Sequence, residues 1–376
     1  MNLPMSSLQG QQLAAPPSPP PPGAVATGPH APGTQPTREA AADWRRFRQH
    51  FCLPDGRVVD DVNDFRTHSE GQGYSMLAAV YFDDREWFET CWSWTRQHLQ
   101  VRPDDRLLAW WWRPDNPGRI PGSGRVADSN NASDADVFVA WALLRAADKW
   151  QRPDWRQEAL AIIHDLRSLQ LQRLNSGLLI LLPAREGFHH GEQITVNLSY
   201  WVFPAFKDFA QVDQHPELWD ELTHNGLRLI QKARFGPDQL PPDWLRLSAD
   251  AMSPCPTHPV CFSYDAIRVP LYLAWFRDRR LERQLFHPFA SLGRHMHQPD
   301  RRPDPTARVW LDGAPADPAH PLLPGMRDVL HLADARATGA LPAVGRLEPG
   351  AGYYSSILQI LVHLAINPAP LFPASP

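Results

Sequence analysis

Helical periodicity is the feature that most constrains the fold of this chain. Apolar residues recur at the three- and four-residue spacing of amphipathic helices along most of the sequence after residue 42. Strand candidates are few and short, such as 177–182 and 193–198, and no short sequence period repeats, which disfavours a solenoid. The pattern predicts an all-α toroid of paired helices around one core. We expect roughly eleven helices, at 43–51, 73–82, 85–99, 134–151, 154–171, 201–212, 216–233, 265–277, 281–296, 326–337 and 353–366.

Proline separates a tail from the part that folds. Residues 1–38 hold ten of the 40 prolines, including the run PPSPPPP, and carry almost no charge. Such a composition is typical of a disordered or polyproline-II segment. The whole chain is 43% hydrophobic, which is sufficient for a sizeable core. No strong linker interrupts the remainder, so we expect a single domain at 39–376.

Charge and hydropathy exclude several partners. The formal net charge of −4 gives no support to nucleic-acid binding. No apolar run reaches the roughly 18 residues that a transmembrane helix needs, so no membrane span is expected. The first 25 residues lack a basic region followed by an apolar core, so they do not form a recognisable signal peptide.

Four cysteines are too few for a disulfide framework. Cys255 and Cys261 flank the short loop CPTHPVC and could close a disulfide in an oxidising compartment. His258 lies between them, but two thiolates and one imidazole lack the fourth ligand of a zinc site. We therefore predict no metal, and the absence of a phosphate loop or dinucleotide motif leaves no cofactor to expect.

Three acidic residues stand where helices are expected to begin. Glu70 lies in the segment THSEGQGYSM, where two glycines would let a backbone or ligand approach closely. Thr67 and Glu70 also have the spacing of a capping box, and local sequence alone favours that structural role. In the second segment, Ser133 and Asp136 have the spacing of a capping pair.

Asp134 is a stronger functional candidate than Asp136, and Asp265 is the third acid at an expected helix start. Asp134 shares a helix face with Phe138 and Trp141, and an acid on an apolar face is costly to bury unless it is paired or used. Asp265 precedes Arg268 by one turn, which also permits a purely local ion pair. In a toroid the inner helices open on one face, so all three acids could meet in one cleft. Carboxylates beside aromatic residues are typical of glycoside hydrolysis.

The segment ASDAD at 132–136, followed by Ala140, Ala142, Ala146 and Trp150, resembles the signature of glycoside hydrolase family 8, with Val139 as the one visible departure. SEGQGYSM, NLSYWVFPAF, SYDAIRVPLYLAW and GYYSSILQILVHLA are similar to further blocks of the family, in the same order. Within the family, the chain resembles the endoglucanases encoded beside bacterial cellulose synthase.

This resemblance implies an (α/α)6 barrel, forming a single catalytic domain, that cleaves internal β-1,4-glucosidic bonds with inversion. It implies that Glu70 is the general acid and Asp265 the general base, with Asp134 binding and distorting the sugar at the cleavage point. Arg268 and the helix start should keep Asp265 ionised. Inversion requires the carboxyls of Glu70 and Asp265 to lie about 6.5–9.5 Å apart, with room for water between them.

Aromatic side chains are the candidate sugar platforms. Trp110, Trp111 and Trp112 are consecutive and cannot all be buried on one face, so at least one should stack on a glucose ring. For every single aromatic residue, a place in the core is as well supported as a place in the cleft. The other substrate-binding candidates are Tyr200, Trp201, Arg268, Tyr353 and Tyr354.

Other interpretations remain open from sequence alone. The same fold could act on chitosan, xylan or mixed-linkage glucan, or the chain could be a non-catalytic glucan-binding subunit. The resemblance further implies a cellulose chain as substrate, the cellulose synthase complex as a candidate partner, and a periplasmic or secreted location. We expect a monomer.

Overall fold

A computed structural model describes residues 36–191, 193–248, 251–278, 281, 283–296, 306–315, 319–342 and 344–367. Contacts between Cα atoms divide the chain into Met1–Gly33, which lies outside these residues, and Thr34–Pro376. Most of the predicted proline-rich tail therefore lies outside the described part. Arg38, the last residue assigned to the tail, already opens the first helix, whose N-terminus is capped by the Thr37 hydroxyl.

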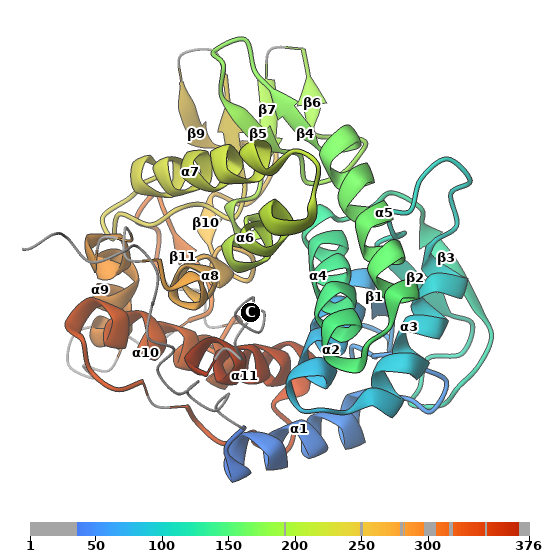
Figure 1. Cartoon of the computed structure of the whole chain (residues 1–376). Helices are drawn as coiled ribbons and strands as arrows, with labels where there is room; N and C mark the ends of the chain where they lie inside the picture. The colour runs from blue at the N-terminus through green and yellow to red at the C-terminus, as the bar shows by residue number, and fades with distance from the viewer. Residues whose placement is uncertain are drawn as a thin grey trace, which may run out of the picture. The chain divides into compact units, whose positions relative to one another are not determined.

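Helices dominate the described residues, as the sequence predicts (Figure 1). Their bounds are α1 Arg38–Phe51, α2 Ser69–Tyr81, α3 Arg85–Leu99, α4 Ser133–Trp150, α5 Pro153–Leu169, α6 Phe203–Val212, α7 Pro216–Lys232, α8 Arg268–Phe276, α9 His287–Met296, α10 Pro324–Thr338 and α11 Gly352–Ile366. Each predicted helix has its counterpart, most ends agree within three residues, and 85–99 is matched at both ends. The largest shifts are at the starts of α1, α2 and α9; Thr37 caps α1, and a 3-10 turn at Arg283–Phe286 precedes α9.

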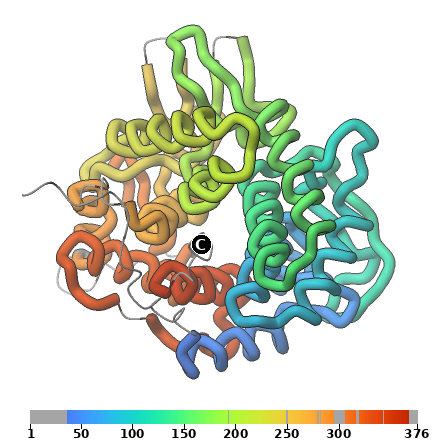
Figure 2. Tube along the Cα trace, in the orientation of Figure 1, coloured from blue at the N-terminus to red at the C-terminus, as the bar shows by residue number. Residues whose placement is uncertain are grey.

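The helices close into a ring (Figure 2). α2 packs on α4, α4 on α6, α6 on α8, α8 on α11, and α11 returns to α2. α3, α5 and α7 pack behind α2, α4 and α6, while α10 packs against α8, α9 and α11. Ring helices such as α4 and α11 are buried along most of their length, because they have neighbours on several sides.

Short strands connect the helices; the candidates 177–182 and 193–198 match β5 and β7, and the other strands were missed from sequence. They form antiparallel sheets in the orders β1-β2-β3, β4-β5, β6-β7-β8-β9 and β10-β11. Two to five residues are too few for a clear period-two pattern, which explains the omission. The bounds are β1 Thr67–His68, β2 Trp111–Pro114, β3 Gly124–Asp128, β4 Leu171–Arg173, β5 Leu179–Leu181, β6 His189–His190, β7 Gln193–Val196, β8 Leu245–Leu247, β9 Met252–Pro254, β10 Cys261–Phe262 and β11 Val309–Trp310.

Gly73 sets how closely α2 approaches α4. A Cβ atom at this position would lie 2.8 Å from the Cβ of Phe138 and 3.2 Å from the backbone nitrogen of Val139. These contacts involve backbone and Cβ atoms that cannot swing away, so the two helices would have to separate. The close approach that the glycines suggested is therefore made by a neighbouring helix.

We expect Gly73→Ala to lower the free energy of unfolding by roughly 1–3 kcal/mol, because it overpacks the α2–α4 contact. Chemical denaturation measures the change. Gly122→Ala is the matched control, since nothing lies within 4 Å of a Cβ added there. Equal stability of the two variants would contradict this account of the helix contact.

Candidate active site

The three acids singled out from sequence meet at one guanidinium. Nη1 of Arg268 donates to Glu70 Oε2 at 2.5 Å and to Asp134 Oδ2 at 3.0 Å. Nη2 of Arg268 donates to Asp265 Oδ1 at 2.7 Å. The hydroxyl of Tyr74 also accepts from Nη1, at 2.9 Å. Arg268 thus links residues that lie between 3 and 198 positions away in sequence.

Helix starts bring these side chains together, as the toroid predicts. Glu70 is in the first turn of α2, Asp134 is in the first turn of α4, and Arg268 is the first residue of α8. Asp265 lies in the turn that precedes α8, three residues before the helix begins. The N-terminal ends of three ring helices therefore converge on one cluster, which we call the acid cluster: Glu70, Asp134, Asp265 and Arg268.

The acid cluster contains two buried side chains and two that are partly exposed to solvent. The side chain of Asp134 has no exposed surface and that of Arg268 is 3% exposed. Glu70 and Asp265 are 22% and 29% exposed. Only the latter two acids can therefore meet a substrate or water in this arrangement. The carboxylate of Asp134 is covered and bound to Arg268.

Both capping roles considered from sequence are wrong. The Thr67 hydroxyl donates to the carbonyl of Val58 at 2.9 Å and accepts from Arg57 Nε, since Thr67 belongs to β1 instead of capping α2. Glu70 is thereby free of the structural role that the local sequence favoured. Its partner is Arg268, 198 residues away.

The second capping pair fails because α4 begins at Ser133 itself, with Ala132 as its N-cap. Asp136 instead accepts hydrogen bonds from the backbone of Leu108 at 2.7 Å and from Asn131 Nδ2 at 2.8 Å. Burial raises the pKa of Asp136 to about 7, with these hydrogen bonds opposing the shift. Asp136 therefore anchors a neighbouring loop and lies outside the acid cluster.

Burial raises the pKa of two carboxyls of the cluster, those of Asp134 and Asp265. The pKa of Asp134 is raised well above 3.8 by desolvation and then by the charge of Glu70, against the opposing effect of Arg268. The pKa of Asp265 is also raised, by desolvation first, while Arg268 and the side chain of Asn197 lower it. Arg268 favours the ionised form of Asp265, as expected, but desolvation has the larger effect on the pKa.

This shift predicts the position of the acidic limb of a pH–rate profile. If Asp265 must be ionised to act, kcat/KM should rise with pH through the pKa of the free enzyme's base. Because the pKa of Asp265 is raised, the midpoint of that rise should lie above 3.8. Initial rates on a soluble oligosaccharide between pH 3 and pH 9 measure it. A midpoint at or below 3.8 would contradict the assignment of this limb to Asp265.

The three consecutive tryptophans divide between surface and core. Trp110 and Trp111 are partly exposed, with ring centroids 5.4 Å apart, and Trp110 lies beside His68 at 6.1 Å. Trp112 is 3% exposed and packs edge-on against Trp94. Trp112 therefore belongs to the core and is not a sugar platform. Trp110 and Trp111 remain as the candidate platforms of this segment. His68 directly precedes α2, so these two indoles flank the segment that carries Glu70.

The remaining aromatic candidates also separate by burial. Trp201 is wholly buried, and Gly226 leaves the space for its ring, so it is a core residue and not a platform. Tyr353 is 3% exposed among Phe47 and Phe51 and is likewise a core residue. Tyr200 is partly exposed, with its ring 5.8 Å from the guanidinium carbon of Arg268.

Tyr354 stays near the site. It is partly exposed, and its hydroxyl donates to the carbonyl of Tyr264, next to Asp265. Two groups escaped the sequence analysis because no motif marks them. Trp244 is partly exposed, stacks on His258 with centroids 4.7 Å apart, and meets Tyr200 edge-on at 6.2 Å. The other is Asp243, which is buried and directly precedes Trp244.

The cysteines are all free thiols in this structure. Cys255 Sγ lies 3.2 Å from the hydroxyl of Thr257, and Cys261 Sγ lies 3.7 Å from Asp243 Oδ2. The considered disulfide between Cys255 and Cys261 is therefore not formed here. Within the described ranges no group of three or more His, Cys, Asp and Glu residues is arranged to hold a metal ion. Nor is any described helix long and apolar enough to cross a membrane.

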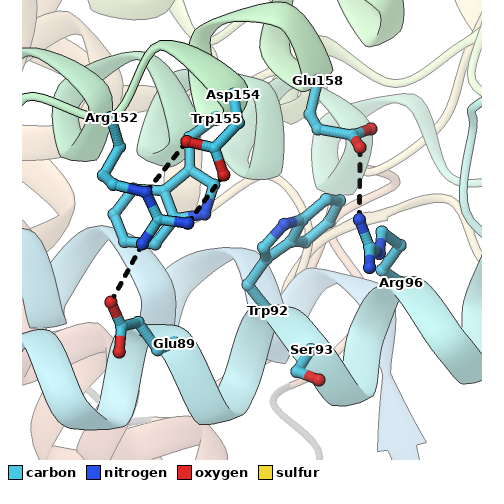
Figure 3. Close-up of a pocket in the computed structure, with 8 residues that line it drawn as sticks. All are labelled: Glu89, Trp92, Ser93, Arg96, Arg152, Asp154, Trp155 and Glu158. Carbon is cyan, nitrogen blue, oxygen red and sulfur yellow. Dashed lines mark hydrogen bonds and ion pairs between the residues drawn. The ribbon is translucent and has the colours of Figure 1, made fainter.

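A separate pocket of about 350 Å³ lies on the outer side of the ring, between α3 and α5 (Figure 3). Its lining residues are Glu89, Trp92, Ser93, Arg96, Arg152, Asp154, Trp155 and Glu158. Both indoles are only 4% exposed, and both arginines form ion pairs with acids of the pocket. It offers no open aromatic face and contains no member of the acid cluster.

Comparison with known proteins supplies the context for this geometry. The sequence profile described as Glycosyl hydrolases family 8 matches residues 33–367. A probable endoglucanase of Novacetimonas hansenii is 36% identical over 338 residues, covering 86% of this chain and 90% of that protein. An endoglucanase of Cellulomonas uda is 37% identical over 237 residues, covering 63% and 64% of the two chains.

Solved structures are similar over most of the chain. The endoglucanase Cel10 of Klebsiella pneumoniae matches with a TM-score of 0.76 and 32% identity, over 86% of this chain and 98% of that one. The endo-β-1,4-glucanase CMCax of Acetobacter xylinum matches with a TM-score of 0.75 and 34% identity, over 87% and 97%. These likenesses confirm the (α/α)6 barrel.

Proposed function

The chain belongs to glycosyl hydrolase family 8, and from this membership we propose that it hydrolyses internal β-1,4-glucosidic bonds of cellulose, with Glu70 and Asp265 as its acid and base. It is a glycoside hydrolase with endoglucanase relatives over most of its length. The observation that carries the assignment of roles is the division of the acid cluster. Of three acids bound to one guanidinium, only Glu70 and Asp265 keep exposed carboxyls.

The proposed reaction is a single displacement with two proton transfers. Glu70 donates a proton to the glycosidic oxygen as the bond to the anomeric carbon breaks. A water molecule attacks that carbon from the opposite face and transfers a proton to Asp265. The sugar ring passes through an oxocarbenium-like transition state, and the products are two shorter chains. No covalent link to the protein forms in this scheme.

Asp134 and Arg268 have supporting roles in this proposal. Asp134 is wholly buried, so its charge acts by holding Arg268 in place. Arg268 in turn donates to both reacting carboxyl groups and fixes their relative positions. A guanidinium suits this role because its planar donors are rigidly spaced and it stays charged at all relevant pH values. Direct binding and distortion of the sugar by Asp134 would require Arg268 to move when substrate enters.

Partly exposed aromatic side chains are the proposed sugar platforms: Trp110, Trp111, Tyr200, Trp244 and Tyr354. Aromatic rings of this kind stack on the apolar faces of glucose units and leave the hydroxyls free to hydrogen-bond. Several such rings near the acid cluster suit a polymer that lies across it, which supports cleavage inside a chain.

Initial rates on carboxymethylcellulose, chitosan, xylan and mixed-linkage β-glucan test the choice of polymer. We expect hydrolysis of carboxymethylcellulose, with a rapid fall in viscosity relative to the reducing ends released, as internal cleavage requires. Turnover of another polymer with none on carboxymethylcellulose would overturn the substrate assignment. Binding of glucan without hydrolysis of any polymer would instead support the non-catalytic alternative.

We further propose that the protein is a monomer that acts outside the cytoplasmic membrane beside cellulose synthase. What supports this is the resemblance to endoglucanases encoded with that synthase. Cell fractionation with an antibody against the protein tests the location, and sedimentation velocity tests the monomer. Removing the gene from a cellulose-producing host should change the yield or crystallinity of cellulose. An unchanged product, or a protein confined to the cytoplasm, would contradict the proposal.

A further inference from the structure

A buried carboxyl behind the acid cluster has no part in the chemistry described above. Asp243 lies between Pro242 and the partly exposed Trp244, two residues before β8, and is 9% exposed. Burial raises its pKa to about 7, and the charge of Asp265 adds to this shift. Because Asp243 lies close to the proposed general base, Asp265, it could affect the reaction without touching the substrate.

Asp243 holds the segment that carries Asp265 at three points. Its backbone N–H donates to the carbonyl of Cys261 at 2.8 Å. Its Oδ1 accepts from the backbone N–H of Ser263 at 2.8 Å and from that of Ala266 at 2.8 Å. Asp265 lies between these two anchored residues. One carboxyl oxygen thus ties down the chain on both sides of Asp265.

The anchoring matters because the segment is short and irregular. Residues 264–267 form a turn between β10 and α8, outside the regular hydrogen bonding of either element. The side chain of Asp265 is 29% exposed and accepts a hydrogen bond from Arg268, which also serves two other acids. A displacement of about 1 Å at a reacting group can cost on the order of a hundredfold in rate.

We propose that Asp243 is a positioning residue for Asp265: it accepts two backbone N–H groups and so holds the turn in the geometry that places the Asp265 carboxylate against the attacking water. This inference rests on the proposed role of Asp265 as general base. What the turn requires from Asp243 is an acceptor oxygen at the right place, and a negative charge is not needed.

Two variants separate the position of the oxygen from the charge. Asp243→Asn keeps an acceptor oxygen in place and removes the charge. Asp243→Glu keeps the charge and moves the oxygens by one methylene group. We expect kcat to fall by roughly tenfold to a hundredfold in Asp243→Glu and to stay within about threefold of the wild type in Asp243→Asn. Because platform residues are untouched, KM and the Kd for a cello-oligosaccharide should change little in both.

The measurement is kcat and KM on cellohexaose. Calorimetric titration gives the fraction of each variant that binds the ligand, and kcat is divided by this fraction. Asp328→Asn is the matched control. Asp328 in α10 is also a buried acid that accepts from a backbone N–H, that of Gly345 at 3.1 Å, and its side chain also accepts from Gln359. It belongs to no part of the acid cluster. Its substitution should lower stability and leave the corrected kcat unchanged.

The outcomes distinguish failure of the positioning role of Asp243 from failure of the proposed base role of Asp265. An Asp243→Glu variant with the wild-type kcat would overturn the positioning role. So would an Asp243→Asn variant that loses as much as Asp243→Glu, since the charge would then be what matters. If Asp328→Asn lost as much of its corrected kcat as Asp243→Glu, the effect at Asp243 would be explained by general destabilisation, which would overturn the positioning role. Asp265→Asn is assayed in the same series, and full activity there would refute the base assignment itself.

Discussion

Glu70→Gln should lose hydrolysis of cellulosic polymer by about 10²–10⁴-fold while glucan binding persists, because the leaving oxygen then departs without a proton. The change is nearly isosteric, so the amide can still meet Arg268 through its oxygen. The polymer is a demanding substrate, since its leaving group is a sugar alkoxide. The loss should therefore appear in kcat, with KM and oligosaccharide affinity changing little.

A substrate with an activated leaving group makes this test specific. 2,4-Dinitrophenyl β-cellotrioside releases a phenolate that needs no proton, so Glu70→Gln should retain far more of its activity on this glycoside than on polymer. Glu86→Gln is a matched control, because Glu86 is an exposed acid in the first turn of α3. Equal losses on both substrates would contradict the general-acid role of Glu70.

Asp265→Asn should lose activity on both substrates, again by about 10²–10⁴-fold, because the attacking water no longer has a base in either reaction. Removing this charge from Arg268 should not displace the guanidinium, which keeps Glu70 and Asp134 as partners. The binding of cello-oligosaccharide should therefore persist, and calorimetric titration checks it.

Asp220→Asn supplies the control for this variant, since Asp220 is an exposed acid in α7. Glu70→Gln and Asp265→Asn should therefore differ. The acid variant should lose activity mainly on polymer, and the base variant should lose activity on both substrates. If Asp265→Asn kept its activity on the activated glycoside, the roles of the two residues would have to be exchanged.

Much of this arrangement could be predicted from sequence, because local patterns carry it. The helical period gave the all-α ring, and the apolar face shared by Asp134, Phe138 and Trp141 placed Asp134 inward. The expectation that helix starts would bring three acids together holds in the structure. Their roles in catalysis remain predictions that the substitutions above test.

What could not be predicted depends on contacts distant in sequence. Thr67 has the spacing of a capping residue, yet it pairs in a sheet with Trp112, 45 positions away. Trp201 has the chemistry of a platform, yet Gly226 opens a place for it in the core. The spacing of Arg268 and Asp265 permitted a local ion pair, and nothing nearby indicated that Arg268 would also reach Glu70 and Asp134.

The direction of the pKa shift at Asp265 could not be predicted from the local sequence either. A helix start and an arginine both favour an ionised Asp265, and the sequence shows both. The opposing effect is desolvation by the surrounding side chains, which depends on the assembled cleft. The supporting contact from Asp243 is of the same kind, because 20 to 23 residues separate it from the N–H groups it accepts.

The anomeric configuration of the newly formed reducing end tests the acid–base pair most directly. Proton NMR during the first minutes of cellohexaose hydrolysis, before mutarotation equilibrates the anomers, distinguishes the two outcomes. Attack by water activated by Asp265, on the face opposite Glu70, converts the β-linkage into an α-anomer, which is therefore the expected first product. Initial release of the β-anomer would contradict the single displacement and the roles given to both carboxylates.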